Sequence, residues 1–345
     1  MSLLPHHDVE AHNQSQVKTL IRALRLAQGQ FSLIFVRCNY SNLRDQILKR
    51  LQPQVTGLVT LYLDPDIRNL YRAIEAELAL QEVQPEILMV FGLEQVMATD
   101  ETLDVANRGR EAFLNLPFPV VLWVNDLLWR RLNRQAPDFT SWGTTLEFIQ
   151  TTPDLIQFLT NGVQRILAVV LDAGGNQLIP NDKILGPHSG SELQAAYQDL
   201  MQRKVEIDPT LEASLRFVLA RYYYAHQQIS EALEQYQLSL AFWERSAIAS
   251  STSSNNSSQT SPTTVTSLEW QGLLLFHTGL CYVYLAEQHL QHSGQSEWEQ
   301  ARVHLQGCIN RFDAANRQDL VAKFIGQLGE ALRQLSNWSD LWTLG

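Results

Sequence analysis

Cysteine is scarce in this chain, with three residues among 345. Cys38, Cys281 and Cys308 lie far apart, and no Cys-x-x-Cys pair occurs. Because disulfide frameworks and zinc sites need several closely spaced thiols, we expect neither, and a reducing cytoplasm is the compartment that fits best. Only Cys38 falls in an expected loop at a strand end, where a reactive thiol and a small half-buried side chain are the two alternatives.

Long apolar runs and an excess of positive charge are also missing. No stretch approaches the roughly 18 uninterrupted apolar residues that cross a bilayer, and the N-terminus has neither the basic nor the apolar region of a signal peptide. We therefore expect no membrane association. The net charge of −10 argues against a general nucleic-acid-binding protein. Arg130, Arg131 and Arg134 cluster on a short helical stretch, which fits a solvated helix face or a local basic patch.

The length of the chain exceeds that of a usual single domain, so two domains are expected. Residues 1–14 are polar and are predicted to form a flexible arm before the first domain. This arm holds three of the nine histidines, but no acidic or cysteine partners complete a metal-ligand set, so we expect no metal site there.

The first half alternates apolar runs with helical patterns. The runs are continuous instead of alternating with polar residues, which is typical of strands buried on both faces of a parallel sheet. The pattern predicts an α/β three-layer domain over residues 15–150. Its four expected strands are residues 31–36, 55–63, 87–91 and 120–124.

Polar residues follow these runs where each strand is expected to end. Parallel α/β sheets bind ligands at the carboxyl ends of their strands, and those ends carry Arg37, Asn39, Asp64, Glu94, Asn125 and Asp126. A carboxylate there could hold Mg²⁺ and an amide could contact a phosphate. The alternative is that polar residues simply terminate the strands.

The first strand–loop–helix junction, over residues 31–51, has the layout of a phosphate-binding loop but not its residue types. A phosphate loop needs glycines so that backbone N–H groups can surround the phosphates, with a lysine and a Ser or Thr for their charge and for Mg²⁺. Residues 37–44 read RCNYSNLR and contain no glycine and no lysine.

Three segments nevertheless resemble a known family. The sequences ILMVFGLE and FPVVLWVND, with residues 130–142, look like the NTPase domain of bacterial STAND-type proteins, most closely cyanobacterial examples. These are AAA-like P-loop ATPases that are often followed by tetratricopeptide repeats. The resemblance implies a degenerate Walker A loop at Asn39, Ser41 and Arg44, a Walker B acid at Glu94 and a polar sensor at Asn125.

The departures from the family bear on its cofactors. Walker A lacks its glycines and lysine, and the third strand ends in Gly-Leu-Glu instead of Asp-Glu, so the acid that would hold Mg²⁺ is missing. We therefore expect no ATP or Mg²⁺ and no ATPase activity, and the five residues named above would form a vestigial nucleotide site. The alternative is an ATP-dependent signalling switch in which Glu94 activates water.

The second half begins with a mixed connector, predicted over residues 151–205, in which residues 166–171 form either a strand or a buried helix. Residues 206–345 then show helix pairs of about 34 residues with small and aromatic side chains at packing positions, which is typical of tetratricopeptide-like repeats; a generic helical bundle is the alternative. A Ser/Thr-rich insertion over residues 246–267 is expected to be disordered. Residues 337–340 are expected to open a further helix.

Helical repeats usually bind proteins or peptides, and this chain offers several aromatic candidates. Tyr222, Tyr224 and Trp270 would line a groove or belong to the core, and Trp338 and Trp342 would form an exposed end that could self-associate. The sequence thus predicts a non-catalytic or weakly nucleotide-binding adaptor that binds partner proteins through its repeats.

Overall fold

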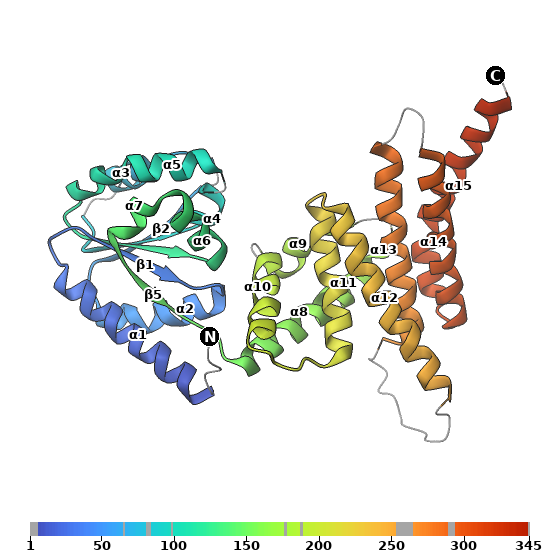
Figure 1. Ribbon diagram of the computed structural model, residues 1–345, viewed down its shortest axis with the longest axis horizontal. Helices are drawn as coiled ribbons and strands as arrows, with labels where there is room; N and C mark the ends of the chain where they lie inside the picture. Colours follow the sequence, from blue (N-terminus) through green and yellow to red (C-terminus); the bar gives the residue numbers. More distant parts are fainter. Residues whose placement is uncertain are drawn as a thin grey trace. The chain divides into compact units, whose positions relative to one another are not determined.

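The computed structural model describes residues 6–64, 66–80, 84–97, 99–175, 178–186, 189–252, 265–288 and 294–343. The chain forms two compact units, Met1–Asp154 and Leu155–Gly345. The first unit is an α/β domain and the second is helical throughout its described residues (Figure 1). The predicted sequence of an α/β domain and an all-α domain is therefore confirmed.

The α/β unit is built on five parallel strands in the order β2-β3-β4-β1-β5. All four predicted strands are present. The strands are β1 (Ser32–Arg37), β2 (Leu58–Tyr62), β3 (Ile87–Phe91), β4 (Pro119–Val124) and β5 (Gly143–Glu147).

The fifth strand was not predicted. β5 pairs with β1 at the edge of the sheet, and only Leu146 among its residues is buried. Its sequence, GTTLE, therefore has no continuous apolar run, since an edge strand has fewer covered positions than a central one. Gly143 is required because an added Cβ would lie 2.5 Å from the ring of Phe35 on the neighbouring strand.

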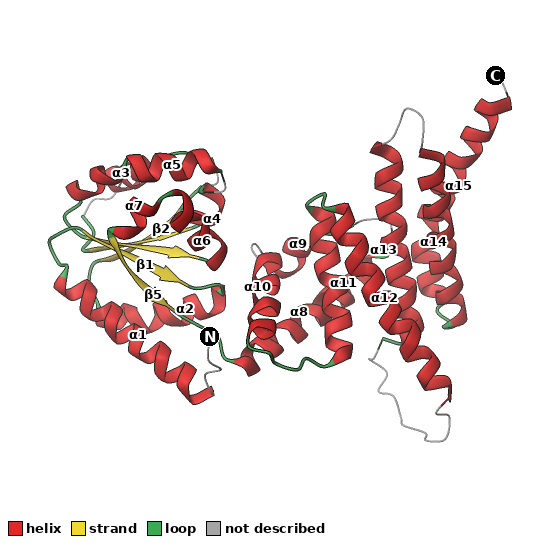
Figure 2. Ribbon diagram, viewed as in Figure 1, coloured by secondary structure: helices red, strands yellow, loops and turns green. Residues whose placement is uncertain are grey.

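Helices cover both faces of the sheet, as Figure 2 shows. On one face lie α1 (His6–Leu26) and α2 (Ser41–Leu51), and on the other lie α3 (Leu70–Leu80), α5 (Asp100–Arg108), α6 (Asp126–Gln135) and α7 (Pro137–Ser141). Leu33, Phe35 and Leu122 point from the strands into the second of these layers, where Phe113 and Phe139 complete the core. A short helix, α4 (Leu93–Val96), follows β3 directly.

The N-terminal segment differs from the prediction. Helix α1 begins at His6, so residues 6–14 are helical and do not form an arm separate from the domain. Its side chains reach the end of β5: His12 Nε2 contacts the carbonyl oxygen of Glu147 at 2.9 Å. Asn13 donates to the carbonyl of Ile149 at 2.7 Å and accepts from the N–H of Ile149 at 3.1 Å. These contacts explain why a polar sequence is helical here.

The predicted mixed connector is helical where the structure describes it. It consists of α8 (Thr152–Ala173), α9 (Asn181–Leu185) and α10 (Ser189–Gln202), so residues 166–171 belong to a helix and not to a strand. In the described part of the chain, α8 alone is long and apolar enough to cross a membrane. It packs on α9 and α10 through Gly162, where an added Cβ would lie 2.9 Å from Leu193 and 3.7 Å from Leu185.

Five long helices follow and pack on one another in chain order (Figure 1). They are α11 (Pro209–Ala225), α12 (Ile229–Thr252), α13 (Ser267–Gln288), α14 (Gly294–Ala314) and α15 (Gln318–Thr343). Small residues allow the close approach that the sequence predicted. A Cβ added at Gly279 would lie 2.8 Å from Leu305, and Ala220, Ala232 and Ala301 are fully buried.

Two predicted breaks in this region are not observed. Helix α12 continues to Thr252, so the predicted disordered insertion does not begin at residue 246, and residues 253–264 lie outside the described part of the chain. Helix α15 runs without interruption to Thr343, so residues 337–340 continue a helix instead of opening one.

Candidate functional site

The carboxyl ends of β1 and β4 meet at the point where the direction of the chain reverses. From β1 the chain crosses to β2 at one edge of the sheet, whereas from β4 it crosses β1 to reach β5 at the other edge. Such a switch point is the usual ligand site of an open parallel sheet. Asn39 and Asn125, both predicted site residues, follow these two strands, so the topology brings them to the same place.

The connection from β1 to α2 is short. Only residues 38–40 separate the end of β1 at Arg37 from the start of α2 at Ser41. Tyr40 occupies the position before the helix and is buried, at 3% exposure. Asn42 accepts a hydrogen bond from the N–H of Leu43 at 2.7 Å through its own side chain. Ser41 and Arg44 are therefore helical residues and not part of a loop that could surround phosphates.

Asp126, the first residue of α6, joins the carboxyl ends of β1 and β4 through its hydrogen bonds. Its Oδ1 accepts from Arg37 Nη2 at 2.7 Å and from Arg37 Nε at 3.1 Å. Its Oδ2 accepts from Asn39 Nδ2 at 3.1 Å, and its N–H donates to Asn39 Oδ1 at 2.9 Å. A carboxylate thus already occupies a helix N-terminus, the place where an anion would otherwise be favoured.

A second carboxylate lies on the other side of Arg37. Glu147, at the end of β5, is 3.3 Å from Arg37 Nη2. The guanidinium also lies over the ring of Trp129, 6.0 Å from its centroid, where it gains a cation–π contact. We name Arg37, Asn39, Asp126 and Glu147 the edge network. It contains two acids and one base, so it presents net negative charge to the switch point.

Asn125 has a structural task in this arrangement. It is the N-cap of α6, and its Oδ1 accepts from the N–H of Leu128 at 2.8 Å. Asn and Asp are favoured at this position because they satisfy a free helical N–H. The predicted sensor residue thus already hydrogen-bonds within its own helix.

Arg44 and Glu94 lie near the carboxyl end of β3, the strand next to β4. The guanidinium of Arg44 lies over the ring of Phe91, the last residue of β3, at 5.2 Å from its centroid. Glu94 is half-buried in the first turn of α4, which begins after Gly92 in a left-handed conformation with φ of 83°. Cys38 is half-buried, and its thiol donates to the carbonyl of Tyr40 at 3.4 Å. Among the described residues, no group of three His, Cys, Asp or Glu is placed to hold a metal ion.

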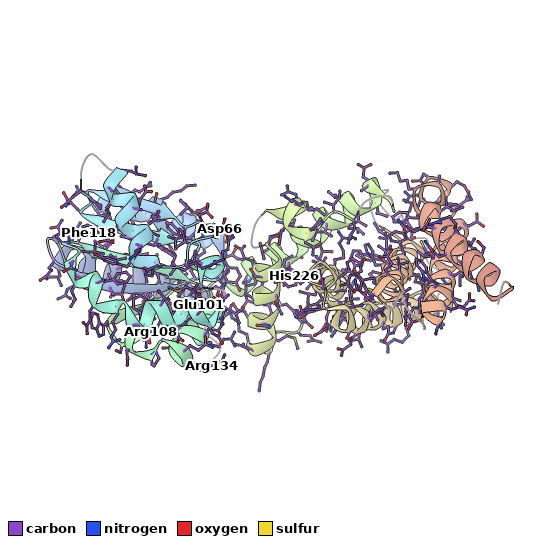
Figure 3. The ribbon with its side chains drawn as sticks, turned by 90° about the horizontal axis from the view of Figure 1, so that it is seen from above. Asp66, Glu101, Arg108, Phe118, Arg134 and His226 are labelled. Carbon is purple, nitrogen blue, oxygen red and sulfur yellow. The ribbon has the colours of Figure 1, made fainter. Side chains whose placement is uncertain are left out.

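The arginine cluster on α6 is partly paired with acids. Arg131 donates to Asp100 at 3.1 Å and to the carbonyl of Met97 at 3.1 Å. Hydrogen bonds from Gln135 and Arg131 lower the pKa of Asp100. Arg134 lies in the last turn of α6, where a cation is favoured by the helix dipole (Figure 3). These contacts are those of a solvated helix face, the first of the two alternatives.

The candidate partner-binding residues of the helical unit have different environments. Trp270 is buried at 4% exposure and stacks on Trp243, with ring centroids 5.1 Å apart. Of the two predicted alternatives, groove and core, Trp270 therefore belongs to the core. Tyr222 is half-buried and packs on Gly190 of α10. Tyr224 lies near Tyr284, and burial raises the pKa of Tyr224 to about 12. The side chains of Trp338 and Trp342 lie outside the described residues.

A buried polar cluster in the helical unit was not predicted. Arg221 of α11 is 4% exposed, and its Nη1 donates to His277 Nε2 at 3.1 Å. Its other donors reach Asn181 Oδ1 at 3.1 Å and the carbonyl of Ile179 at 2.5 Å. Burial, and secondarily the charge of Arg221, lowers the pKa of His277 well below its ordinary value. Arg221 and His277 stand in helical patterns on different helices, so their pairing was not visible in the sequence.

Two comparisons with known proteins found no family for this chain. No protein-family model matches it, and no curated protein matches it significantly.

Proposed function

We propose that the chain is a non-catalytic adaptor, in which a degenerate STAND-like α/β domain is joined to tetratricopeptide-like repeats that bind a partner protein. The observation that carries the first part is the edge network. Asp126 and Glu147 place two carboxylates around Arg37 at the switch point, so a nucleotide phosphate brought there would meet negative charge.

The short β1–α2 connection supports the same conclusion. Only residues 38–40 precede the helix, the N–H of Cys38 already donates to the carbonyl of Val124 at 2.9 Å, and Tyr40 is buried in the domain. A phosphate loop needs a longer, glycine-rich stretch that can bend around the phosphates. The strand and helix on either side keep their structural roles without it.

The helical unit supports the second part of the proposal. Helices α11 to α15 pack in series, with small residues at their contacts, as expected of a repeat array. Such arrays present extended surfaces to protein partners and have no chemistry of their own. The partner would be a protein or peptide, and a cytoplasmic location remains part of the proposal.

Titration with Mg-ATP tests the adaptor against the alternative, a STAND-type switch. Isothermal calorimetry on the full chain should show no binding below millimolar concentrations, because the edge network repels phosphate. The control is Glu94→Gln, which should behave as the wild type does. Micromolar binding that is lost in Glu94→Gln would support the switch, with Glu94 in its nucleotide site, and would contradict the proposed adaptor.

Affinity purification of the tagged full chain, followed by mass spectrometry, tests partner binding. The adaptor should retain a specific protein that the isolated α/β unit does not retain. Retention of the same proteins by both would place the partner site outside the repeats.

A further inference from the structure

The first helices of the repeat pairs form one continuous surface. Arg221 of α11 contacts His277 of α13 at 3.1 Å, and Phe276 of α13 packs edge-on against Phe324 of α15, with centroids 4.8 Å apart. We call this face of α11, α13 and α15 the repeat surface. It includes Lys323, one turn along the α15 helix from Asp319.

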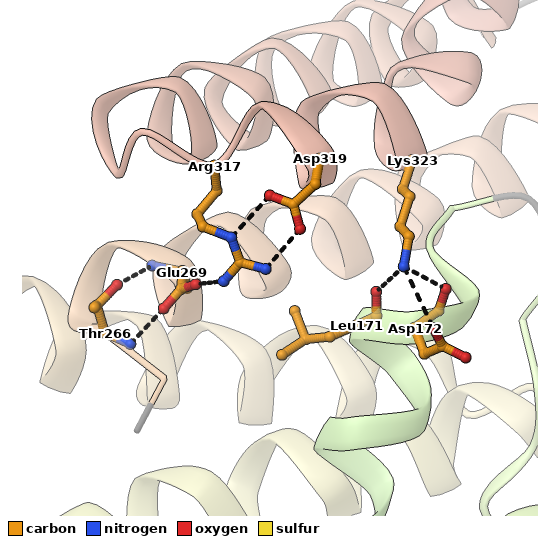
Figure 4. Close-up of polar contacts among 7 residues, drawn as sticks. All are labelled: Leu171, Asp172, Thr266, Glu269, Arg317, Asp319 and Lys323. Carbon is orange, nitrogen blue, oxygen red and sulfur yellow. Dashed lines mark hydrogen bonds and ion pairs between the residues drawn. The ribbon is translucent and has the colours of Figure 1, made fainter. Parts of the chain in front are cut away.

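The chain itself already lies across this surface. Residues 171–175 and 178–181, which leave α8 and enter α9, contact all three helices; we call them the internal segment. Lys323 Nζ donates to the carbonyl oxygens of Leu171 at 3.2 Å and Asp172 at 2.8 Å, as Figure 4 shows. The N–H of Gly175 donates to the carbonyl of Lys323 at 3.0 Å.

The other end of the internal segment is held by α11. Arg221 Nη2 donates to the carbonyl of Ile179 at 2.5 Å, and Asn181 Nδ2 donates to the carbonyl of Val218 at 2.9 Å. Most of these contacts join a side chain of the repeat surface to a main-chain carbonyl. Main-chain groups are the same in every polypeptide, so another segment could make the same hydrogen bonds.

Two glycines determine which segment fits. Gly174 is left-handed, with φ of +68°, and an added Cβ would lie 2.7 Å from Cβ of Lys323. An added Cβ at Gly175 would lie 3.0 Å from the ring of Phe276. The surface therefore selects small residues at these two positions, followed by the aliphatic residues Leu178 and Ile179.

The internal segment does not fill the surface completely. A cavity of about 20 Å³ remains among Gly174, Gly175, Ile179, Arg221 and His277, which is room for about one water molecule. The ion pair that joins Lys323 to Asp172 is 3.5 Å long, and the Asp172 side chain is 92% exposed. Exposed pairs of this kind contribute little, so the end of the segment at α15 is the weakly held one, whereas Asn181 and Arg221 at the other end are buried.

We propose that the repeat surface binds a peptide segment of a partner protein and that the internal segment occupies the same place in cis as a displaceable ligand. The partner segment has the chemistry of the internal one: two small residues, then aliphatic residues, with main-chain carbonyls for Lys323 and Arg221. This proposal rests on the adaptor function above. It adds that partner binding competes with the chain's own segment.

The test uses a fluorescein-labelled peptide of residues 171–183, LDAGGNQLIPNDK. Gly174→Val should dislodge the internal segment, because its side chain would meet Lys323, while leaving the repeat surface unchanged. By fluorescence anisotropy, this variant should bind the peptide at least ten times more tightly than the wild type does. Adding Lys323→Ala to Gly174→Val should remove the gain.

Gly186→Val is the matched control. Gly186 has φ of +110° and ψ of 166°, a region that is essentially restricted to glycine, so valine there carries at least as much backbone strain, but an added Cβ meets no atom within 4 Å. This variant should bind the peptide as weakly as the wild type does. Equal binding by Gly174→Val and Gly186→Val, with both folded by circular dichroism, would overturn the proposal.

Hydrogen exchange keeps the test decisive if Gly174→Val does not fold. In the wild type, the Gly175 amide should exchange faster when excess peptide is added, while the amides in the middle of α13 should not change. Unchanged exchange at Gly175 would mean that the segment is a fixed part of the fold. If Gly175 exchange is unchanged and a partner still co-purifies, that partner binds at another surface. If the peptide binds the repeat surface but no partner co-purifies, the result contradicts the adaptor function and not the displaceable segment.

Discussion

Arg37 shows how one side chain can decide what an edge of a sheet holds. It stands at the end of β1 and contacts Asp126 at 2.7 Å, Glu147 at 3.3 Å and the Trp129 ring. In an active phosphate site a cation here would face the ligand. In this chain its charge is paired with two acids of the same domain, so we expect the network to contribute to stability.

Replacement of Asp126 by Asn tests this role. Asp126→Asn keeps the shape but removes the charge that Arg37 and Asn39 contact, so the free energy of unfolding should fall by about 1–2 kcal/mol, allowing for partial exposure of the pair. Urea denaturation followed by circular dichroism measures it. Asp45→Asn is the control, because Asp45 lies 3.6 Å from Arg44 and its side chain is 58% exposed; it should change stability by less than about 0.5 kcal/mol.

His277 makes the helical unit sensitive to acid. Its pKa lies well below 6.5 in the folded chain because the ring is buried and lies beside Arg221. Between the folded and unfolded pKa values the unfolded chain binds more protons, so stability is highest above pH 6.5 and decreases as the pH falls below it. The slope should approach about 1.4 kcal/mol per pH unit for this one proton.

Thermal unfolding between pH 5 and pH 8 checks this prediction. His277→Asn should remove most of the loss below pH 6.5, whatever it costs at neutral pH. Phe276→Leu, at the adjacent and equally buried position of α13, should lower stability at every pH without changing the slope. Identical slopes in His277→Asn and the wild type would show that another group governs the acid response.

Only part of the residue-level arrangement could be predicted. The strand ends identified Asn39, Glu94, Asn125 and Asp126, because strand ends follow directly from the apolar runs. The pairing of Arg37 with Asp126 depends on β1 lying next to β4, and strand order is not encoded in any single run. Glu147, the last residue of β5, was missed because the sequence of that strand, GTTLE, contains no continuous apolar run.

At the scale of elements, the repeat helices approach closely where glycine faces a large side chain. A Cβ added at Gly272 of α13 would lie 2.6 Å from the ring of Phe312, which is fully buried on α14 and cannot move aside. By contrast, a Cβ added at Gly329 of α15 meets no atom within 4 Å. The same residue type therefore serves packing in one helix and has no packing role in the other.

The two glycines should respond in opposite directions to alanine. Gly329→Ala should raise the free energy of unfolding by about 0.5–1 kcal/mol, because alanine favours the helix. Gly272→Ala gains the same propensity but overpacks the α13–α14 contact, so a net loss of about 1–2 kcal/mol is expected. Urea denaturation of both variants measures the difference. Stabilisation by Gly272→Ala would mean that the two helices are less tightly packed than described.

Elements were predictable where local pattern and burial agree. The four apolar strands and the helical pattern of the second half were predicted correctly on this basis. The start of α1 was misplaced because contacts of His12 and Asn13 with the distant residues 147–149 stabilise a polar helix end. In the connector, residues 166–171 take the helix of the two predicted alternatives, and Gly174 and Gly175 form a turn that fits against α13 and α15.

At the scale of the whole molecule, the main polar contacts of the two units differ in burial. In Met1–Asp154 the charged groups of the switch point pair with one another at the surface of the domain. In Leu155–Gly345 a buried arginine and histidine lie beneath a segment that crosses three helices. The length and composition of the chain predict two domains, but they do not show that the connector belongs to the second one.

The contacts of α1 with the end of β5 have a consequence for handling the protein. The main-chain groups of Glu147 and Ile149 are hydrogen-bonded by His12 and Asn13, which shields this side of the sheet from strand addition by another molecule. A truncation that begins at residue 15 would leave those groups open and favour edge-to-edge aggregation. We therefore expect the domain to express and crystallise better when residues 6–14 are kept.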